Sequence, residues 1–499
     1  MEPRFILLYS PQIFDPKFGS IKPEGSLGLI YLISALRDEN FDVSLLDATV
    51  GNDNYSLSET FYRQEIQSDG MIRVGMQIQD ILLEIKDYDV IGITSIFTAQ
   101  TRIIEKVVSS IKKMYPKKLI VLGGVNARYQ RKRFFNSGAD LICLSEAERT
   151  IVEIGKVLRN NSEDFSDIKG LAGKNGFVNN QTDIIYNLDD LPIPAWDMQP
   201  LKKYWEIGRS HGLNKPNIAY APIMFSRGCP FRCHFCHISK EINDSISGNI
   251  GSLRLKSAER IDLEIDILKN LGVQYLCIED DSLLAKKKRV LDIFNRISEK
   301  NLKLGDMNGI NLVHLCTNKK GKIEVDDELL EAMSHAGFKN LSFPVESGSQ
   351  RIIDKYATGK LDLEKHDISA LIRKATSLGM EIQGSYTFGY PDETYSEMIS
   401  TFNLARKHIN DGLDITNFSI ITPFPGTVLY DMAIQENLLL KDPADMIIER
   451  PSMKTKVPQW FLKLLVTKGW EYVNKSSKIE EIKRMTPNNM MAKEVLRDG

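Results

Sequence analysis

Two long stretches of this 499-residue chain alternate short apolar runs with longer amphipathic ones. In about the first 150 residues the apolar runs have strand length, as at Phe5–Tyr9, Val90–Thr94 and Leu119–Leu122, and helical patterns lie between them. The alternation resumes with a longer period from Ala219 to about Pro425. Such alternation predicts parallel sheets flanked by helices, with ligand sites at the carboxyl ends of the strands. We therefore expect an α/β fold with more than one domain.

Composition places the chain among ordinary globular proteins, with 42% hydrophobic residues, 26% charged residues and a net charge of −2. Because this balance creates no basic field, nucleic acid is not expected as an obligatory partner. Residues 1–11 hold too short an apolar core for a signal peptide. No run reaches the roughly 18 apolar residues of a membrane helix. The expectation is a cytoplasmic protein without a transmembrane segment.

Three of the six cysteines, Cys229, Cys233 and Cys236, lie within eight positions, in the stretch 226–237 that directly follows the apolar run 220–225. Three thiolates can bind three irons of a [4Fe–4S] cube and leave the fourth iron open to a small molecule. A structural zinc site needs a fourth ligand, which His234 or His237 could supply. Zinc sites usually show a second pair of ligands, and the chain has none. The spacing therefore favours the iron–sulfur cluster.

This motif, with the aromatic Phe235 before its last cysteine, resembles the signature of the radical S-adenosylmethionine (SAM) superfamily. The resemblance implies a partial (β/α)6 barrel, whose third strand is expected near Met307–Val313. It also implies that the three cysteines are the catalytic and metal-binding residues, that SAM binds the open iron, and that Phe235 packs by the adenine. Members of this family cleave SAM reductively to a 5′-deoxyadenosyl radical, which takes hydrogen from an unactivated carbon. An electron donor such as flavodoxin or ferredoxin is implied as a partner.

Polar residues at other predicted strand ends match family positions that contact SAM. Asp280, Asp281 and Ser282 follow the second predicted barrel strand, where the family binds the methionyl amino group, and an ammonium needs acceptors. Glu346, in a Glu-Ser-Gly-Ser run, resembles the ribose-binding carboxylate. Ser385 is expected to face the cofactor. Each acid could instead cap a helix, since Asp and Ser commonly occupy that position.

Loops of the first domain resemble those of cobalamin-binding Rossmann-like domains. Gly123 and Gly124 remove side chains where an extended ligand approaches the backbone. Ser95 and Thr98 offer hydroxyls at a strand end. A Gly-Gly after a strand can also be a simple tight turn, but beside a radical SAM motif it favours cobalamin. The predicted cobalamin contacts are Ser95, Ile96, Phe97, Thr98, Gly123, Gly124, Val125, Asn126, Ser145 and Glu146.

All seven histidines lie beyond residue 210. Many cobalamin domains carry a DxHxxG motif whose histidine binds cobalt from below, and this domain has no histidine for that role. Cobalamin is therefore expected base-off and without a histidine ligand, as is common in the radical SAM subgroup. The same absence would also fit a domain that has lost the cofactor.

Four segments are expected along the chain. They are a cobalamin-binding domain at 1–158, a bridging segment at 159–215, the radical SAM barrel at 216–438 and a small helical C-terminal region at 439–499. Without the family resemblance, the proline-containing run around Trp196 would be an extended linker. The aromatic amphipathic run 458–465 favours packing on the barrel over binding a membrane surface or a partner.

Together these features predict a cobalamin-dependent radical SAM methyltransferase acting on an unactivated carbon, with a [4Fe–4S] cluster, SAM and cobalamin as cofactors. One alternative is a cobalamin-dependent radical SAM cyclase or rearrangement enzyme without methyl transfer. Another is a zinc-stabilised cobalamin-binding scaffold without enzymatic activity. Methylthiotransfer is disfavoured because the N-terminal domain holds only one cysteine, not the three that a second cluster needs. Small-molecule, peptide and protein substrates all remain open.

Overall fold

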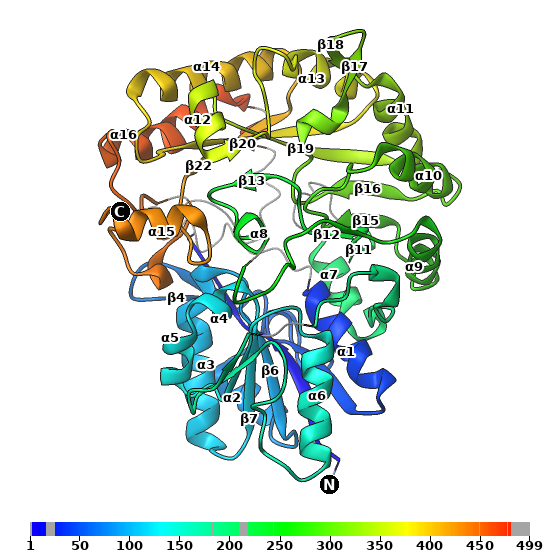
Figure 1. The fold of residues 1–499 in the computed structure, drawn as a ribbon, viewed down its shortest axis with the longest axis vertical. Coiled ribbons are helices and arrows are strands. Elements are labelled where there is room, and N and C mark those ends of the chain that lie inside the picture. Colours follow the sequence, from blue (N-terminus) through cyan, green and yellow to red (C-terminus); the bar gives the residue numbers. More distant parts are fainter. Residues whose placement is uncertain are drawn as a thin grey trace. The chain divides into compact units, whose positions relative to one another are not determined.

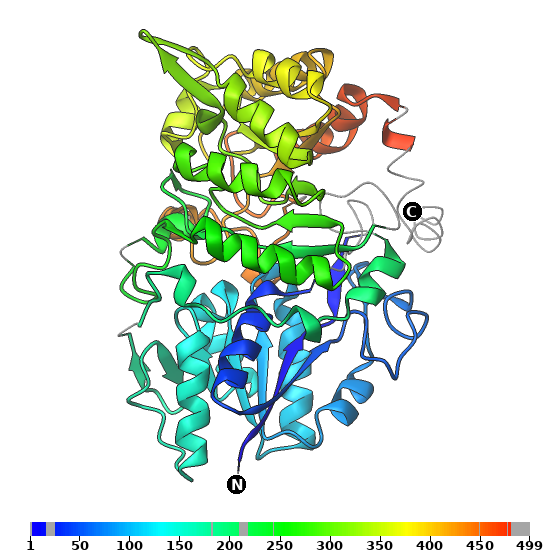
Figure 2. The same cartoon turned by 90° about the vertical axis from the view of Figure 1, so that its right-hand side faces the viewer.

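The structure is a computed structural model that describes residues 2–15, 25–180, 183–208, 218–242, 244–448, 450–476 and 478–480. The chain divides into two compact units (Figures 1 and 2). Unit 1 comprises Met1–Arg209, Glu241–Ile250 and Thr486–Gly499, and unit 2 comprises Ser210–Lys240 and Gly251–Met485. The last part of the expected bridging segment, 209–215, and of the expected C-terminal region, 481–499, lies outside the described residues.

A seven-stranded sheet with the order β10-β9-β8-β7-β6-β1-β3 forms the centre of unit 1. Its strands are β1 (Arg4–Tyr9), β3 (Asp42–Asp47), β6 (Val90–Thr94), β7 (Leu119–Gly123), β8 (Leu141–Cys143), β9 (Leu171–Gly173) and β10 (Val178–Asn179). The pairs from β3 to β8 are parallel, and β9 and β10 extend the sheet antiparallel. Covered on both faces, β1 and β6 consist almost entirely of buried apolar residues, which explains why the sequence reveals them.

Helices cover both faces of this sheet (Figure 1). One face carries α1 (Leu27–Asp38) and α6 (Glu148–Arg159), and the other carries α2 (Ile78–Glu84), α3 (Thr101–Met114) and α5 (Arg131–Ser137). The chain passes from β1 to β3 on one side and from β6 to β7 and β8 on the other. The winding direction therefore changes between β1 and β6. Ligands of doubly wound sheets bind in the crevice at this switch point.

The segment around Trp196 is an integral part of unit 1 rather than an extended linker. The Trp196 side chain is buried, and the Ser34 hydroxyl of α1 donates to the Ile193 carbonyl at 2.5 Å. From α7 (Leu201–Ile207), the Tyr204 hydroxyl donates to the Asp47 carboxylate at 2.6 Å. The prolines stiffen the backbone, but buried contacts with α1 and β3 decide where the segment lies.

Unit 2 is built on a six-stranded parallel sheet with the order β11-β15-β16-β19-β21-β22. The strands are β11 (Tyr220–Ile223), β15 (Tyr275–Ile278), β16 (Lys303–Asp306), β19 (Phe338–Glu346), β21 (Glu381–Phe388) and β22 (Ile415–Ile420). Helices α9 (Ala258–Asn270), α10 (Lys287–Ser298), α11 (Asp327–Ala336), α13 (Ile368–Ser377) and α14 (Tyr395–Asn410) lie around its outside (Figure 1). With β11 and β22 at its two ends, the sheet is an open barrel of six βα units. The predicted α/β architecture is confirmed.

The third barrel strand lies earlier than expected. It is β16, which ends at Asp306, and the apolar residues that predicted a strand at 307–313 lead into the 3-10 helix η4 (Leu312–Leu315). The strand was missed because Gly305 lies in its middle; a Cβ there would come within 2.2 Å of the Tyr275 hydroxyl. A short hairpin of β17 (Cys316–Lys319) and β18 (Lys322–Val325) follows and projects from the barrel (Figure 2).

The described part of the C-terminal region packs against the barrel, as expected. It contains α16 (Gln459–Leu464), the π-helical turn η6 (Leu465–Gly469) and α17 (Trp470–Val473). The Trp470 indole donates to the Thr416 carbonyl of β22 at 2.6 Å, and the Asn474 side chain accepts from the Thr416 amide at 2.8 Å. Within the described residues, no helix is both long and apolar enough to cross a bilayer.

Candidate active site

The cysteine loop, residues 226–237, follows β11 and is held by short backbone ladders. Strand β12 (Ser226–Arg227) pairs with β14 (Arg254–Leu255), and β13 (Arg232–Cys233) pairs with β20 (Ala357–Thr358). Between the two ladders, the Cys229 amide donates to the Gly251 carbonyl at 3.1 Å. After the last cysteine the chain forms the single turn α8 (His237–Lys240). The loop is therefore shaped by contacts with distant segments of unit 2, not by its own sequence alone.

Gly228 makes the sharp approach of this loop possible. Its φ of +81° lies in the left-handed region that favours glycine. A Cβ at this position would come within 2.4 Å of the Ser252 carbonyl oxygen and 2.6 Å of the Gly251 oxygen. Both obstacles are backbone atoms, so a side chain could not be accommodated by a rotamer change. The glycine next to Cys229 thus determines where the first thiol lies.

The three thiols of the loop lie close enough to influence one another's charge. Burial raises the pKa of Cys229, raises that of Cys233 to about 11 and raises that of Cys236 to about 12. The Cys229 thiolate adds to the rise at Cys233, and the Cys233 thiolate adds to the rise at Cys236. Among the described residues, no three His, Cys, Asp or Glu side chains form a group able to hold a single metal ion. Three cysteine thiols are the donor set that a [4Fe–4S] cube with one open iron requires.

Glu346 lies at the carboxyl end of β19 in a strained backbone conformation. Its φ is +68°, and the register of β19 against β21 shifts between Pro344 and Glu346. The carboxylate is largely buried; it accepts from the Lys360 ammonium at 2.5 Å and from the Thr387 hydroxyl at 3.2 Å. Residues other than glycine held at positive φ cluster at functional sites. The predicted ribose-binding carboxylate therefore occupies a position that the surrounding structure fixes firmly.

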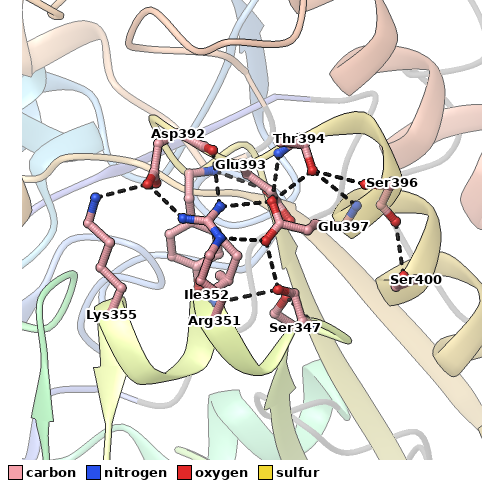
Figure 3. Close-up of polar contacts among 12 residues, drawn as sticks. Ser347, Arg351, Ile352, Lys355, Asp392, Glu393, Thr394, Ser396, Glu397 and Ser400 are labelled. Atoms are coloured by element: carbon pink, nitrogen blue, oxygen red, sulfur yellow. Dashed lines mark hydrogen bonds and ion pairs between the residues drawn. The ribbon is translucent and has the colours of Figure 1, made fainter.

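A polar network fixes the helix that begins just after Glu346. Helix α12 (Gln350–Tyr356) carries Arg351, whose guanidinium lies between Asp392 and Glu397, with ion-pair distances of 2.8 and 2.7 Å (Figure 3). The Arg351 side chain lowers the pKa of Glu397 to about 2. Glu397 also completes the capping box of α14. The start of α12 is thus tied to the start of α14.

Gly348 lets the Glu-Ser-Gly turn approach α14 closely. A Cβ on Gly348 would lie 2.7 Å from backbone atoms of Ser400 and Thr401. The Thr401 hydroxyl accepts from the Gly348 amide at 2.9 Å and lies 3.2 Å from the Ser347 hydroxyl. These contacts leave the turn after Glu346 little freedom.

The other predicted SAM residues lie around the same barrel. Asp280 is fully buried, and its carboxylate accepts from the Phe225 amide at 2.6 Å and from the Ser226 hydroxyl. Because these bonds hold the beginning of the cysteine loop, Asp280 has a clear structural role, and its contact with SAM stays a prediction. The Asn311 amide donates to the hydroxyl of buried Ser282 at 3.4 Å.

The remaining three predicted SAM residues occupy different positions. Asp281 is half-buried, and its charge raises the pKa of Cys229 and Cys236 beyond the effect of burial. The Phe235 ring lies 6.2 Å from the Tyr390 ring, at the edge of a small apolar cluster. Ser385 lies on β21 opposite Pro344. Their contacts with SAM stay predictions.

In unit 1, the predicted cobalamin residues meet at one edge of the sheet. They follow β6, β7 and β8, which are parallel neighbours and therefore end on the same side. Gly124 has a φ of +100°, and a Cβ there would come within 2.5 Å of the Ser95 carbonyl oxygen. The Asn126 side-chain amide donates to the Ser95 hydroxyl at 2.8 Å, and the Asn126 backbone amide donates to the Ser95 carbonyl at 3.1 Å. The two loops are thus locked together.

This edge also exposes apolar side chains. Ile96 is 41% exposed and Phe97 is 59% exposed, whereas the neighbouring Thr98 is buried. Val125 and Glu146 are half-buried at the same edge, and the Ser145 hydroxyl is engaged with the chain itself. Exposed apolar residues beside a closely packed Gly-Gly turn suit a large, flat ligand.

The ten residues Glu241–Ile250, shortly after the last cysteine of the loop, belong to unit 1. Glu241 forms an ion pair with Arg128, and the Tyr129 hydroxyl donates to Asp244 at 2.9 Å. The Ser145 hydroxyl donates to the Ser247 carbonyl at 2.8 Å. The predicted cobalamin-binding edge is therefore completed by residues distant in sequence.

Two family models match the chain. Residues 223–405 match the radical SAM superfamily, and residues 23–155 match the B12 binding domain. The chain therefore contains a B12 binding domain followed by a radical SAM domain. The radical SAM domain implies a [4Fe–4S] cluster and SAM, and the B12-binding domain implies cobalamin.

Curated relatives match most of this chain. An uncharacterised methyltransferase of Pyrococcus horikoshii is 28% identical over 424 residues, 83% of this chain and 79% of the relative. The cytidylyl-2-hydroxyethylphosphonate methyltransferase of Streptomyces wedmorensis is 24% identical over 84% of this chain and 79% of its own. The anaerobic magnesium-protoporphyrin IX monomethyl ester cyclase of Cereibacter sphaeroides is 24% identical over 74% of this chain and 56% of the cyclase.

Solved structures show the same fold. The cobalamin-dependent SAM radical enzyme OxsB, with aqua-cobalamin bound, matches 99% of this chain and 75% of its own with a TM-score of 0.67 and 16% identity. The radical SAM methyltransferase TsrM from Kitasatospora setae, with cobalamin and a [4Fe–4S] cluster bound, matches 87% of this chain and 75% of its own with a TM-score of 0.58 and 16% identity.

The sequence left three contributors to these two sites unidentified. Lys360 and Thr387 contact Glu346 from separate segments of the chain, and no local sequence motif predicts either contact. Residues 241–250 follow the cysteine motif in sequence but complete the other domain. Buried charges need partners, and those of Glu346 and Arg128 come from segments that are distant in the sequence.

Proposed function

We propose that this protein is a cobalamin-dependent radical SAM methyltransferase that methylates an unactivated carbon. The three cysteines of the loop, spaced CxxxCxxC, carry the proposal, because three ligands on a cube leave one iron open to SAM. The methyltransferases among the relatives support methyl transfer as the outcome. The absence of any histidine before residue 210 supports base-off cobalamin without a histidine ligand.

Each cofactor has residues that would hold it. Cys229, Cys233 and Cys236 would bind the cluster, and the Glu346 carboxylate would accept hydrogen bonds from the SAM ribose. Ile96 and Phe97 would provide apolar contact for the corrin at the sheet edge of unit 1. When bound, the cofactors supply a carbon radical and a transferable methyl group, while the protein supplies position and shelter from water.

The proposed reaction consumes two SAM molecules for each methyl group transferred. One leaves as 5′-deoxyadenosine, which has gained the substrate hydrogen, and methionine; the other leaves as S-adenosylhomocysteine after giving up its methyl. Two electrons from an external donor such as flavodoxin or ferredoxin balance the reaction. The substrate is a small molecule, peptide or protein with an accessible C–H bond. A reducing cytoplasm suits the six free thiols, none of which forms a disulfide in the described residues.

Two half-reactions test the proposal without a known substrate. The protein is reconstituted anaerobically with iron and sulfide, reduced with dithionite and given SAM, and 5′-deoxyadenosine is measured. In a second reaction, hydroxocobalamin reduced to the cob(I) form is added with SAM, and S-adenosylhomocysteine is measured. We expect both nucleosides to form.

Matched variants separate the possible outcomes. Cys233→Ser should lose iron and 5′-deoxyadenosine formation, whereas Cys316→Ser, outside the loop, should keep both. Formation of 5′-deoxyadenosine without S-adenosylhomocysteine would favour a cyclase or rearrangement enzyme. About one zinc and no iron per chain after reconstitution would instead identify a zinc-stabilised scaffold.

A further inference from the structure

Lys360 is connected to the cysteine loop through the backbone. Strand β13 places Cys233 opposite Ala357 of β20, and the His234 amide donates to the Tyr356 carbonyl at 2.8 Å. The Lys360 amide then donates back to the Ala357 carbonyl at 3.0 Å, which closes a tight turn. The position of the lysine is therefore set by the same ladder that sets the position of the cluster-binding loop.

The Lys360 side chain turns from this ladder toward Glu346. The Nζ atom lies 2.5 Å from the Glu346 Oε1, and the two side chains are only 11% and 10% exposed. Burial alone would lower the pKa of Lys360, but the charges of Glu346 and Cys233 raise it above its ordinary value. The lysine thus carries its positive charge between a carboxylate and the thiols of the loop.

The contacts of Glu346 leave lone pairs of its carboxylate unused. Its Oε1 accepts from Lys360 and its Oε2 accepts from the Thr387 hydroxyl. An ionised carboxylate offers about four lone-pair sites, so about two remain free. Two neighbouring ribose hydroxyls could donate to these free sites while both protein contacts persist. The ion pair would then orient the carboxylate instead of competing with the ligand.

Another buried lysine pair in unit 2 shows what a structural pair looks like. Lys256 and Glu264 are both 0% exposed and 2.5 Å apart, and Arg260 also binds Glu264, at 2.8 Å. That glutamate lies within α9, in regular helix. Glu346, in contrast, sits at a strand end with a strained φ of +68°. Buried ion pairs contribute little net stability, so such a strained arrangement requires another explanation.

We propose that Lys360 is a positioning residue of the SAM site, which holds the Glu346 carboxylate in the orientation that binds the ribose and ties it to the cysteine loop. This inference rests on the proposed function, since it assumes that Glu346 binds the nucleoside. It makes the ribose site and the cluster site two ends of one connected element: Cys233, the β13–β20 ladder, Lys360 and Glu346.

The test measures SAM and S-adenosylhomocysteine affinity in the iron-loaded protein by calorimetry. Lys360→Met should weaken binding of both by about tenfold or more, because a charge-assisted hydrogen bond to Glu346 is lost. Lys360→Arg should restore most of the affinity because it keeps the charge. The matched control Lys365→Met, an exposed lysine of unit 2, should bind as the wild type does. Equal affinities of Lys360→Met and the wild type would overturn the inference.

A double-mutant cycle then shows whether Lys360 acts through Glu346. If it does, Glu346→Gln and the double variant Glu346→Gln/Lys360→Met should bind SAM equally weakly. Additive losses would mean that Lys360 acts independently, and the inference would be wrong. If Lys360→Met fails to load iron, Lys360→Arg and Glu346→Gln still decide: near-wild-type affinity of Glu346→Gln overturns the inference. A wild type that binds neither iron nor SAM would contradict the proposed function itself.

Discussion

Arg128 and Glu241 form a buried ion pair inside unit 1, although 113 residues separate them in the chain. Their side chains are only 5% and 6% exposed. Arg128 lies on α4 (Val125–Tyr129), directly after the Gly-Gly turn, and Glu241 follows Cys236 by five positions. The pair thus anchors the segment behind the cysteine loop to the helix that begins at the predicted cobalamin-binding edge.

Removing the charge of Glu241 should destabilise unit 1. Glu241→Gln leaves the Arg128 guanidinium buried without a counter-charge, so we expect the free energy of unfolding to fall by about 3 kcal/mol. Urea unfolding measures the change, and hydrogen exchange should show faster opening around α4. The exposed pair of Glu153 and Lys156 offers a control, since Glu153→Gln should change stability by less than about 1 kcal/mol. Equal effects of the two variants would contradict the importance of the buried pair.

A side chain at Gly228 should disrupt the cysteine loop. Gly228→Ala adds a Cβ that collides with the backbone at Gly251 and Ser252, and we expect a clear loss of iron incorporated on reconstitution. Gly379 is a close match, because its φ of +80° is nearly the same and its Cβ would meet nothing within 4 Å. Gly379→Ala should cost only the strain of the left-handed conformation, about 1–2 kcal/mol, and keep its iron. Full iron content in Gly228→Ala would show that the loop tolerates the shift.

An equivalent comparison tests the predicted cobalamin site. Gly124→Ala would drive a methyl group into the Ser95 carbonyl and separate the loops after β6 and β7. Cobalamin affinity, followed by the absorbance change on titration, should fall by about tenfold or more, since a clash with backbone typically costs more than about 1.4 kcal/mol. Gly176 has a φ of +101° and open space at its Cβ position, so Gly176→Ala should bind cobalamin normally. If both variants bind as the wild type does, the Gly-Gly turn is not part of the site.

Stability should fall as pH rises between 5 and 8, in part because of Asp306. Burial at the end of β16 raises the pKa of Asp306 to about 8, against about 3.9 for an unfolded chain. Across this range the folded protein keeps a proton that the unfolded protein releases, so rising pH favours unfolding. One such group changes the free energy of unfolding by up to about 1.4 kcal/mol per pH unit. Asp306→Asn cannot titrate and should show a shallower decline in urea unfolding; parallel curves would exclude this role.

The sequence predicted the parallel strands best. Val90–Thr94 and Leu119–Leu122 are covered on both faces of the sheet. Because both faces must then be apolar, these strands appear in the sequence as continuous apolar runs. Strand β16 was not predicted because Gly305 and Asp306 interrupt its apolar run. The failure has a physical cause: Gly305 makes space for Tyr275, a requirement that only the neighbouring strand reveals.

Site residues could be predicted only where they belong to a short sequence motif with a characteristic spacing. The cysteines and Glu346 stand in short motifs, and the structure places them in one unit at the carboxyl ends of β11 and β19. The position of Lys360 is set by two-residue strands that pair across more than a hundred positions of the sequence. Strands this short show no periodicity by which the sequence could predict them. The residues 241–250 likewise contribute through tertiary contacts alone. Which of the predicted residues bind SAM or cobalamin stays a prediction.

The ladder between β13 and β20 also bears on how the metal centre is assembled. Because Cys233 is fixed by pairing with Ala357, much of the conformational entropy of the loop is lost during folding of the barrel and not when iron arrives. The cluster would then bind to a loop that is already folded. Iron and sulfide would meet a folded acceptor, and the affinity of that acceptor for its cluster would depend on residues more than a hundred positions away from Cys233 in the sequence.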